Sequence, residues 1–240
     1  MVQTPSANIL IDAGYGFRAI VSRLAECDLT VRDISAIVVT HEHSDHVSAL
    51  PHLAKHCSAT VYVPAAALTY LAQSCVCSNI QGVDGPFQIA DTKIDVYRCS
   101  HDARACLGYR FTTEDDSVAS VTDTGVATQE LIRFLSPCRT VVLESNHDVA
   151  MLKNGPYPYY LKRRILSELG HLSNDQCAQI LQKLAGTKVQ NVVLAHLSQQ
   201  NNTPKLAMER ATRALSEVGL VAGKDIFLYV ADQYKNEVTL

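Results

Sequence analysis

The sequence predicts an α/β protein whose strands end at polar residues and whose helices follow those strands. Short runs rich in β-branched residues indicate the strands, and residues 34–39 (Ile-Ser-Ala-Ile-Val-Val) form the clearest of them. Residues 47–54 are typical of a helix, and another helix is indicated after Ser173 or Asn174, either of which can cap it. With 240 residues, 47% of them hydrophobic, the chain can bury a large core, and we expect residues 1–240 to form a single domain.

The strand at residues 34–39 leads directly into the segment Thr-His-Glu-His-Ser-Asp-His at residues 40–46, which is dense in side chains that can bind a metal. His41 and His43 are two positions apart in an extended segment, so their side chains point the same way and can hold one ion. Asp45 and His46 follow as the chain turns into the helix, and they would reach a second ion. His and Asp are donors that suit zinc, manganese or iron, and open sites of this kind activate water. The cluster therefore predicts a metal site.

Further candidate ligands occupy the same kind of position, at the carboxyl end of an apolar segment. A single polar residue in such a place is as often a cap or a loop residue as a ligand, but here the arrangement repeats along the chain. Asp12 also follows an apolar run, and we expect it to orient a ligand rather than bind the ion itself. The repeated candidates are His101, Asp123 and His196, which follow residues 94–100, 117–122 and 191–195.

In order along the chain, Asp12, the cluster at 41–46, His101, Asp123 and His196 match the five motifs of the metallo-β-lactamase superfamily. The chain resembles this superfamily over nearly its whole length. The resemblance implies an αβ/βα sandwich, two β-sheets flanked by helices, with two metal ions at the rim of the sheets. Lactamases of the common class carry Cys where this chain has Asp123, so we do not expect antibiotic hydrolysis. The resemblance assigns His41, His43 and His101 to the first ion, Asp45, His46 and His196 to the second, and Asp123 to a bridging position.

Segments in the last part of the chain narrow the resemblance. Residues 144–148, 170–174 and 194–198 resemble the Glu, Gly-His-Ser and Thr-His-x-Ser elements of ribonuclease Z. The continuous stretch 144–174 is more similar to the YycJ/WalJ branch, whose members are regarded as 5′-to-3′ exonucleases. That branch usually opens with a strand and a Gly/Ser-rich turn before the strand of Asp12, so we expect the first hairpin of this chain to be incomplete.

The resemblance implies a binuclear metal-dependent phosphodiesterase, a 5′-to-3′ DNA exonuclease whose nucleophile is a metal-bridging hydroxide. It implies two divalent ions per chain (zinc or manganese, with iron a further fit) and a nucleic-acid substrate, DNA in preference to RNA. Asp45 is then both a ligand and a catalytic residue. His171, oriented by Glu144, is the candidate general acid or phosphate clamp, and His147 is the second candidate for this role.

Charge argues against a large nucleic-acid footprint, because the net charge is −3 and the pI is about 6.3. A local contact remains open at Arg163 and Arg164, which are candidates for substrate phosphate; an ordinary solvated helix face is the equal alternative. The tyrosines within residues 157–160 can stack on bases or pack a loop.

Two other functions fit the same residues. The first is a small-molecule hydrolase of the same fold, either a cyclic phosphodiesterase or a glyoxalase II-like thioesterase. The second is a non-catalytic partner in cell-wall signalling that keeps its metals. A separate zinc site formed by Cys75 and Cys77 with His52 and His56 is a weak alternative, because its spacing matches no common pattern. Scattered cysteines, no signal-peptide pattern and no apolar stretch of about 20 residues favour a reduced cytoplasmic protein that does not enter a membrane. Nothing in the sequence indicates an oligomeric state.

Overall fold

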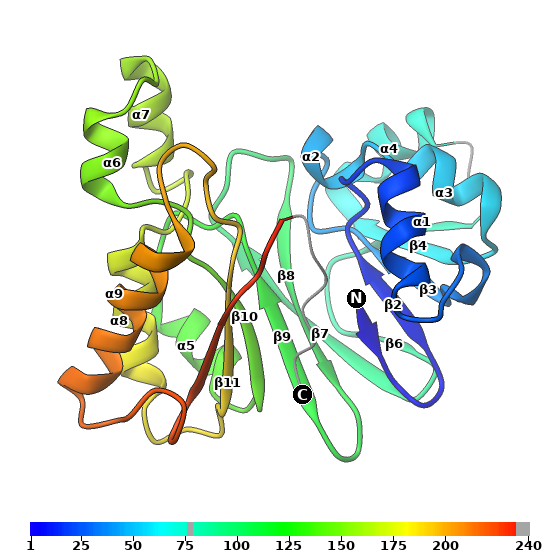
Figure 1. Cartoon of the computed structure of the whole chain (residues 1–240). Helices are drawn as coiled ribbons and strands as arrows, with labels where there is room; N and C mark the ends of the chain where they lie inside the picture. The colour runs from blue at the N-terminus through cyan, green and yellow to red at the C-terminus, as the bar shows by residue number, and fades with distance from the viewer. Residues whose placement is uncertain (76–78, 234–240) are drawn as a thin grey trace. The chain divides into compact units, whose positions relative to one another are not determined.

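The computed structural model describes residues 1–75 and 79–233, and these fall into two compact units (Figure 1). The N-terminal unit contains residues 1–98 and 103–114, and the C-terminal unit contains residues 99–102 and the chain from 115 onward. Together their elements make an α/β protein of sheets flanked by helices, as the sequence predicts.

The N-terminal unit is built on a five-stranded sheet in the order β1-β2-β3-β4-β5. β1 is antiparallel to β2, and the other neighbours are parallel. Every residue of β3 is buried, because both faces of this parallel strand are covered. A strand in that position is apolar throughout its length. The strands are β1 (Val2–Gln3), β2 (Asn8–Ile11), β3 (Ala36–Val38), β4 (Thr60–Pro64) and β5 (Ile80–Val83).

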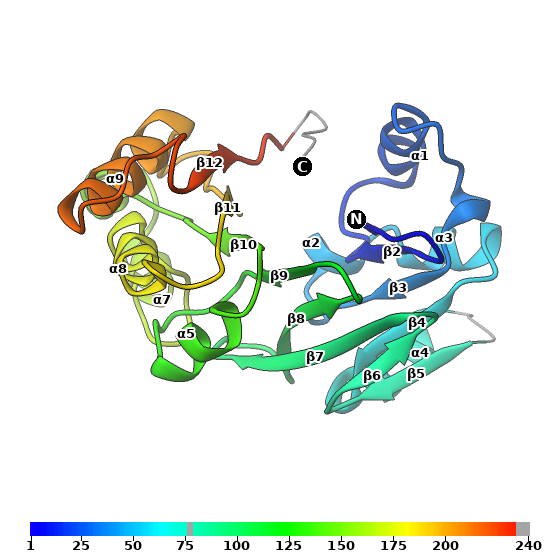
Figure 2. The ribbon, with the colours of Figure 1, turned by 90° about the horizontal axis from the view of Figure 1, so that it is seen from below.

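The two faces of this sheet are covered differently. Ile37 and Val61 point to one face, where they pack against apolar residues of α1 (Phe17–Ala25), α3 (Leu50–His56) and α4 (Leu68–Ser74). Ile9 and Val38 point to the other face and pack against Tyr109 and its neighbours. Figure 2 shows β6 to β8 on the side of β2 and β3 opposite α1. These strands are β6 (Phe87–Ile89), β7 (Thr92–Cys99) and β8 (Cys106–Thr112), and short 3₁₀ turns lie at Val31–Asp33 and Ala65–Ala67.

The C-terminal unit contains parallel strands in the order β12-β11-β10-β9. Helices α8 and α9 pack side by side next to them (Figure 1). α8 begins with a capping box in which the Ser173 hydroxyl accepts from the Gln176 amide and the Gln176 side chain reaches back. The strands are β9 (Ser117–Val121), β10 (Thr140–Glu144), β11 (Asn191–Ala195) and β12 (Phe227–Val230); the helices are α5 (Gln129–Leu135), α6 (Val149–Asn154), α7 (Tyr159–Ile165), α8 (Asn174–Leu184) and α9 (Pro204–Glu217).

Two local expectations are resolved by the structure. The helix expected over residues 47–54 is wrong in its continuity, because α2 (Ser44–Val47) ends before α3 begins at Leu50. Pro51 lies in the first turn of α3, where its missing amide is tolerated, and its ring prevents one helix from running through. The cap of α8 is Ser173 and not Asn174.

The structure also bears on the predictions about the cysteines and about membrane-spanning helices. No disulfide joins the cysteines of the described part of the chain. Cys77, one half of the alternative zinc pair, lies outside the described residues. None of the helices formed by residues 1–75 and 79–233 is long and apolar enough to cross a membrane.

Candidate metal centre

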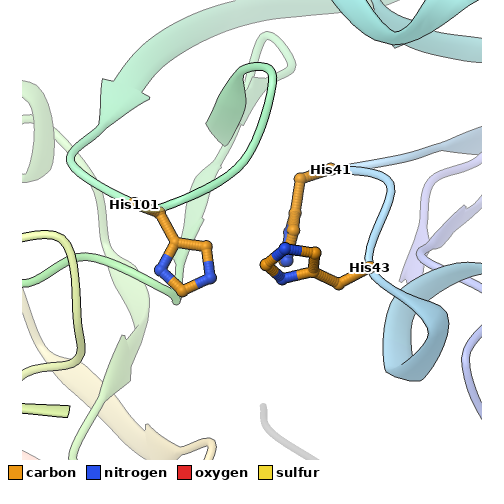
Figure 3. A group of neighbouring side chains, drawn as sticks. All are labelled: His41, His43 and His101. Carbon is orange, nitrogen blue, oxygen red and sulfur yellow. The ribbon is translucent and has the colours of Figure 1, made fainter. Parts of the chain in front are cut away.

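The loop after β3 gathers imidazoles in the N-terminal unit. The ring centroids of His41 and His43 are 4.5 Å apart, and those of His41 and His46 are 4.2 Å apart. Figure 3 shows His41 and His43 on this loop. His46 belongs to the single turn of α2, so the change from extended chain to helix brings it back toward His41. Asp45 on the same turn is largely exposed, and its Oδ2 lies 3.8 Å from Nε2 of His46.

Asp12 contacts the ring of His46 and is itself held by two hydrogen bonds from Thr40. Asp12 accepts from the Thr40 amide at 2.7 Å and from the Thr40 hydroxyl at 2.8 Å, and Nδ1 of His46 lies 2.7 Å from Asp12 Oδ2. A carboxylate can only accept, so Nδ1 of His46 carries the proton and Nε2 carries the lone pair. Nε2 is therefore the nitrogen through which His46 can bind a metal. Thr40 had not been singled out from the sequence.

Gly14 allows the strand-end loop of Asp12 to lie against α2. A Cβ at Gly14 would lie 1.4 Å from the carbonyl oxygen of Asp45, so no other residue fits without moving the backbone. The amide of Ala13 donates to the carbonyl of His46 at 2.7 Å, which ties the same two segments together. The backbone thus holds Asp12 in the place where it orients His46.

In the C-terminal unit, Glu144 at the end of β10 orients two further histidines. Its Oε1 accepts from Nδ1 of His171 and from Nδ1 of His196, both at 2.8 Å. Its Oε2 accepts from the backbone amides of Thr124 and Leu172, both at 3.1 Å. Burial alone would raise the pKa of Glu144, but the hydrogen bonds from His171 and His196 outweigh it and hold that pKa well below its usual range. Glu144 is therefore a fully buried carboxylate that stays charged.

Asp123 completes a compact donor group in this unit. Its Oδ1 lies 3.6 Å from Nε2 of His196 and 3.5 Å from Nδ1 of His171. Because Glu144 takes Nδ1 of His196, the Nε2 that faces Asp123 keeps the lone pair. One donor atom from each of Asp123, Glu144, His171 and His196 lies within 4.8 Å of the others.

His101 lies beside the same group, with its Nδ1 3.2 Å from the Gly170 carbonyl, which must accept. Its Nε2 lies 3.9 Å from Asp123 Oδ1 and 3.4 Å from Asp102 Oδ1. Burial lowers the pKa of His101 and so favours the neutral imidazole, which is the form that binds metals.

Three of the predicted site residues share an uncommon backbone conformation. Asp12, Asp123 and His196 have φ angles of 58°, 56° and 58°, and each comes directly after a strand or one residue beyond it. Left-handed φ values are costly for residues other than glycine, although Asp and His tolerate them better than most, and such strain gathers at functional sites.

Three further predicted residues, His147, Arg163 and Arg164, do not belong to these donor groups. His147 is 1% exposed, and neither of its ring nitrogens has a hydrogen-bond partner among the described residues. Burial lowers the pKa of His147 to about 4, so it is neutral at neutral pH. Arg164, one of the two candidates for substrate phosphate, donates to both carboxylate oxygens of Asp102 at 2.5 and 2.9 Å. Arg163 lies over the ring of Tyr159, 5.9 Å from its centroid.

A buried layer of amides, missed in the sequence, supports the strand ends. The side chain of Asn146 donates to the carbonyl of His196 at 2.8 Å. The side chain of Asn202 donates to the carbonyls of Ser145 and Asn146 and lies 2.9 Å from the side-chain oxygen of Asn174. The residues of each unit thus fit a transition metal, because the donors are imidazole and carboxylate. In His46, His101 and His196, a carboxylate or a carbonyl holds Nδ1, so Nε2 is the nitrogen that could bind a metal.

Comparison with known proteins gives a consistent family. Residues 7–197 match the model of the β-lactamase superfamily domain. The exodeoxyribonuclease WalJ of Streptococcus pneumoniae serotype 2 is 33% identical over 235 residues, which cover 95% of this chain and 87% of the relative. The exodeoxyribonuclease YycJ of Bacillus anthracis is 33% identical over 238 residues, covering 96% and 89%.

Solved structures agree on the fold. The metallo-β-lactamase fold protein YhfI of Bacillus subtilis has a TM-score of 0.71 at 16% identity, and covers 95% of this chain and 86% of its own. The Zn²⁺-bound PqqB of Methylobacterium extorquens has a TM-score of 0.69 at 14% identity, covering 95% and 83%.

Proposed function

The chain belongs to the metallo-β-lactamase superfamily, in the YycJ/WalJ branch, and on that basis we propose that it is a metal-dependent exonuclease that degrades DNA from the 5′ end. The names of its relatives in S. pneumoniae and B. anthracis support this activity. The observation that carries the proposal is the shared oxygen of Glu144, which holds His196 toward Asp123 and His171 beside it. A metal ligand and a proton donor are thereby fixed by one buried charge.

We further propose that two divalent ions bind per chain. Zinc and manganese suit the donors, as does iron. Such ions, when bound, lower the pKa of water and neutralise the charge that builds on a phosphodiester. The match of the family model from residue 7 to residue 197 includes residues of both units, which supports the proposal that they belong to one domain. The ligands would be His41, His43, His101, Asp123, Asp45, His46 and His196.

The chain's own residues supply the proton chemistry. His171 is held by Glu144 at Nδ1, so its Nε2 is the atom that can donate a proton to the leaving oxygen. Glu144 cannot turn away from His171, because the backbone amides of Thr124 and Leu172 hold its other oxygen. The side chain of His171 is 15% exposed, so a substrate can reach it. His147, buried and neutral, lacks this access and is not the acid in this proposal.

The test uses end-labelled DNA and RNA, single- and double-stranded, with each end blocked in turn, in added manganese or zinc. We expect DNA to be shortened from its 5′ side, and a blocked 5′ end to stop the reaction. The matched control is Asp123→Asn, which keeps the size of the side chain and removes the ligand charge. Hydrolysis of a cyclic phosphodiester or a thioester without DNA cleavage would favour the small-molecule hydrolase. No turnover of any of these substrates by the metal-loaded protein would favour the non-catalytic role.

A further inference from the structure

The hairpin of α6 and α7 carries the most exposed aromatic side chains of the described chain. Tyr159 is 75% exposed and Tyr160 is 74% exposed, whereas no other large apolar side chain of residues 1–75 and 79–233 exceeds 54%. Two neighbouring tyrosines in water contribute little to the core, so their presence calls for another explanation. We propose that Tyr159, Tyr160 and Arg163 form a stacking surface for the unpaired bases of a single-stranded DNA end; this rests on the proposed nuclease function.

The hairpin holds its shape without these tyrosines. The Asp148 side chain caps α6 by accepting from the Met151 amide at 2.7 Å. Nζ of Lys162 donates to the carbonyls of Lys153 and Gly155 at 2.8 and 2.7 Å, which ties α7 to the end of α6. The exposed rings are therefore presented on a fixed support, which lowers the entropy lost when a base stacks on them.

Charge identifies the occupant as a polyanion. Residues 149–169 contain four basic residues and one acidic residue in a chain whose net charge is −3. Arg164 is committed to Asp102, and Lys162 to backbone carbonyls. Arg163 is exposed, lies 5.9 Å from the centroid of the Tyr159 ring, and pairs with no carboxylate in the described part of the chain. A cation beside an aromatic face is the combination that binds a phosphate and stacks on its base.

The end of α7 is joined directly to the candidate acid. The His171 amide donates to the carbonyl of Ile165, the last residue of α7, at 3.1 Å. Gly170 allows this approach, because a Cβ there would lie 2.1 Å from the Ile165 carbonyl oxygen and 2.4 Å from that of Arg164. Figure 1 shows α6 and α7 as a pair beyond α8 and α9, within the same unit as His171. A strand whose bases stack on the hairpin is thus led toward the residue that would protonate its leaving oxygen.

Binding of a labelled, phosphorothioate-linked single-stranded DNA to the metal-loaded full chain tests the proposal by fluorescence anisotropy. We expect Tyr159→Ala/Tyr160→Ala to weaken binding at least about tenfold, from the usual strength of base–aromatic stacking. Tyr159→Phe/Tyr160→Phe keeps the rings and should bind as the wild type does. The matched control is Tyr70, a half-exposed tyrosine of α4 whose ring lies beneath the guanidinium of Arg104. Tyr70→Ala should leave DNA binding unchanged.

A second comparison uses the wild-type protein and does not depend on how a variant folds. Replacing the terminal nucleotides by abasic ones removes the bases and keeps the phosphates, and should cost as much affinity as the double alanine variant. When the abasic strand is combined with the double alanine variant, the two losses of affinity should not add, because each change removes the same base–tyrosine contact. Equal binding of abasic and normal strands would overturn the proposal. A change of oligomeric state in the double alanine variant would also overturn it, because the tyrosines would then form a contact between copies of the chain.

The proposed function and the stacking surface can fail separately. If the wild type cleaves no DNA, the proposed function fails. If the wild type cleaves DNA and the double alanine variant binds it as tightly as the wild type does, only the stacking surface is overturned.

Discussion

Oε1 of Glu144 lies 2.8 Å from Nδ1 of His171. The same oxygen lies 2.8 Å from Nδ1 of His196, so one atom sets the tautomer of both rings. Each histidine can therefore use only Nε2 for a further contact. Nε2 of His196 faces Asp123, and Nε2 of His171 is the atom that could donate to a substrate. The arrangement predicts that one substitution at Glu144 disturbs metal binding and proton transfer together.

Glu144→Gln should lower metal affinity by about 10–100-fold and turnover by about 10²–10⁴-fold. A glutamine cannot serve all four partners, because its amide nitrogen would face either the histidines or the backbone amides of Thr124 and Leu172, which are donors. Calorimetric titration with zinc or manganese gives the affinity, and rates at saturating metal give the turnover. Wild-type affinity in this variant would contradict the role of Glu144 as the orienter of His196.

His171→Ala should leave the metal content near that of the wild type and lower turnover by about 10²–10⁴-fold, the range for a lost general acid. The deficit should shrink on a nitrophenyl phosphodiester, whose leaving group needs no proton. His147→Ala is the control, because a buried histidine that donates no proton should lose stability rather than this substrate dependence. Loss of metal from His171→Ala would make His171 a ligand.

Metal analysis of the loaded protein should approach two ions per chain, and Asp123→Ala should weaken the binding of both, because Asp123 would hold both ions in the proposed ligand set. Elemental analysis after gentle purification and reloading measures the stoichiometry. Asp115→Ala, which removes an exposed carboxylate outside the predicted ligand set, is the control. A saturated stoichiometry of one ion or none would refute the binuclear proposal.

The pKa of His147, lowered by burial to about 4, predicts acid sensitivity of the metal-free protein. The unfolded chain binds a proton at this residue near pH 6.5, whereas the folded chain resists it until about pH 4, so stability is full above pH 6.5 and falls as the pH drops toward 4. Between pH 6.5 and pH 5 the loss should be about 2 kcal/mol, from about 1.4 kcal/mol per pH unit. Denaturant unfolding of the wild type and of His147→Gln over this range measures it; parallel pH profiles would contradict it.

The strand-end pattern predicted where several candidate ligands lie, because a polar residue that follows the carboxyl end of an apolar strand is visible in the sequence. Asp12, Asp123 and His196 lie at such ends. The break between α2 and α3 was missed, although Pro51 in the first turn of α3 marks it in the sequence. The partner of Arg164 could not be predicted, because Asp102 is 62 positions away and the sequence does not show which side chains surround an arginine.

That difference between the two arginines gives the last prediction. Arg163→Glu should weaken DNA cleavage and spare a small phosphodiester, because Arg163 is exposed and, in the described chain, pairs with no carboxylate and contacts only the exposed ring of Tyr159. Arg164→Glu should instead lower thermal stability and impair both substrates, since it places a second carboxylate against Asp102, next to His101. Rates on both substrates and melting curves of the two variants separate these effects. Because few phosphates are contacted, DNA cleavage by the wild type should fall only gradually with salt, and Arg163→Glu should make that slope shallower still. Equal losses on both substrates in Arg163→Glu would remove Arg163 from the DNA path.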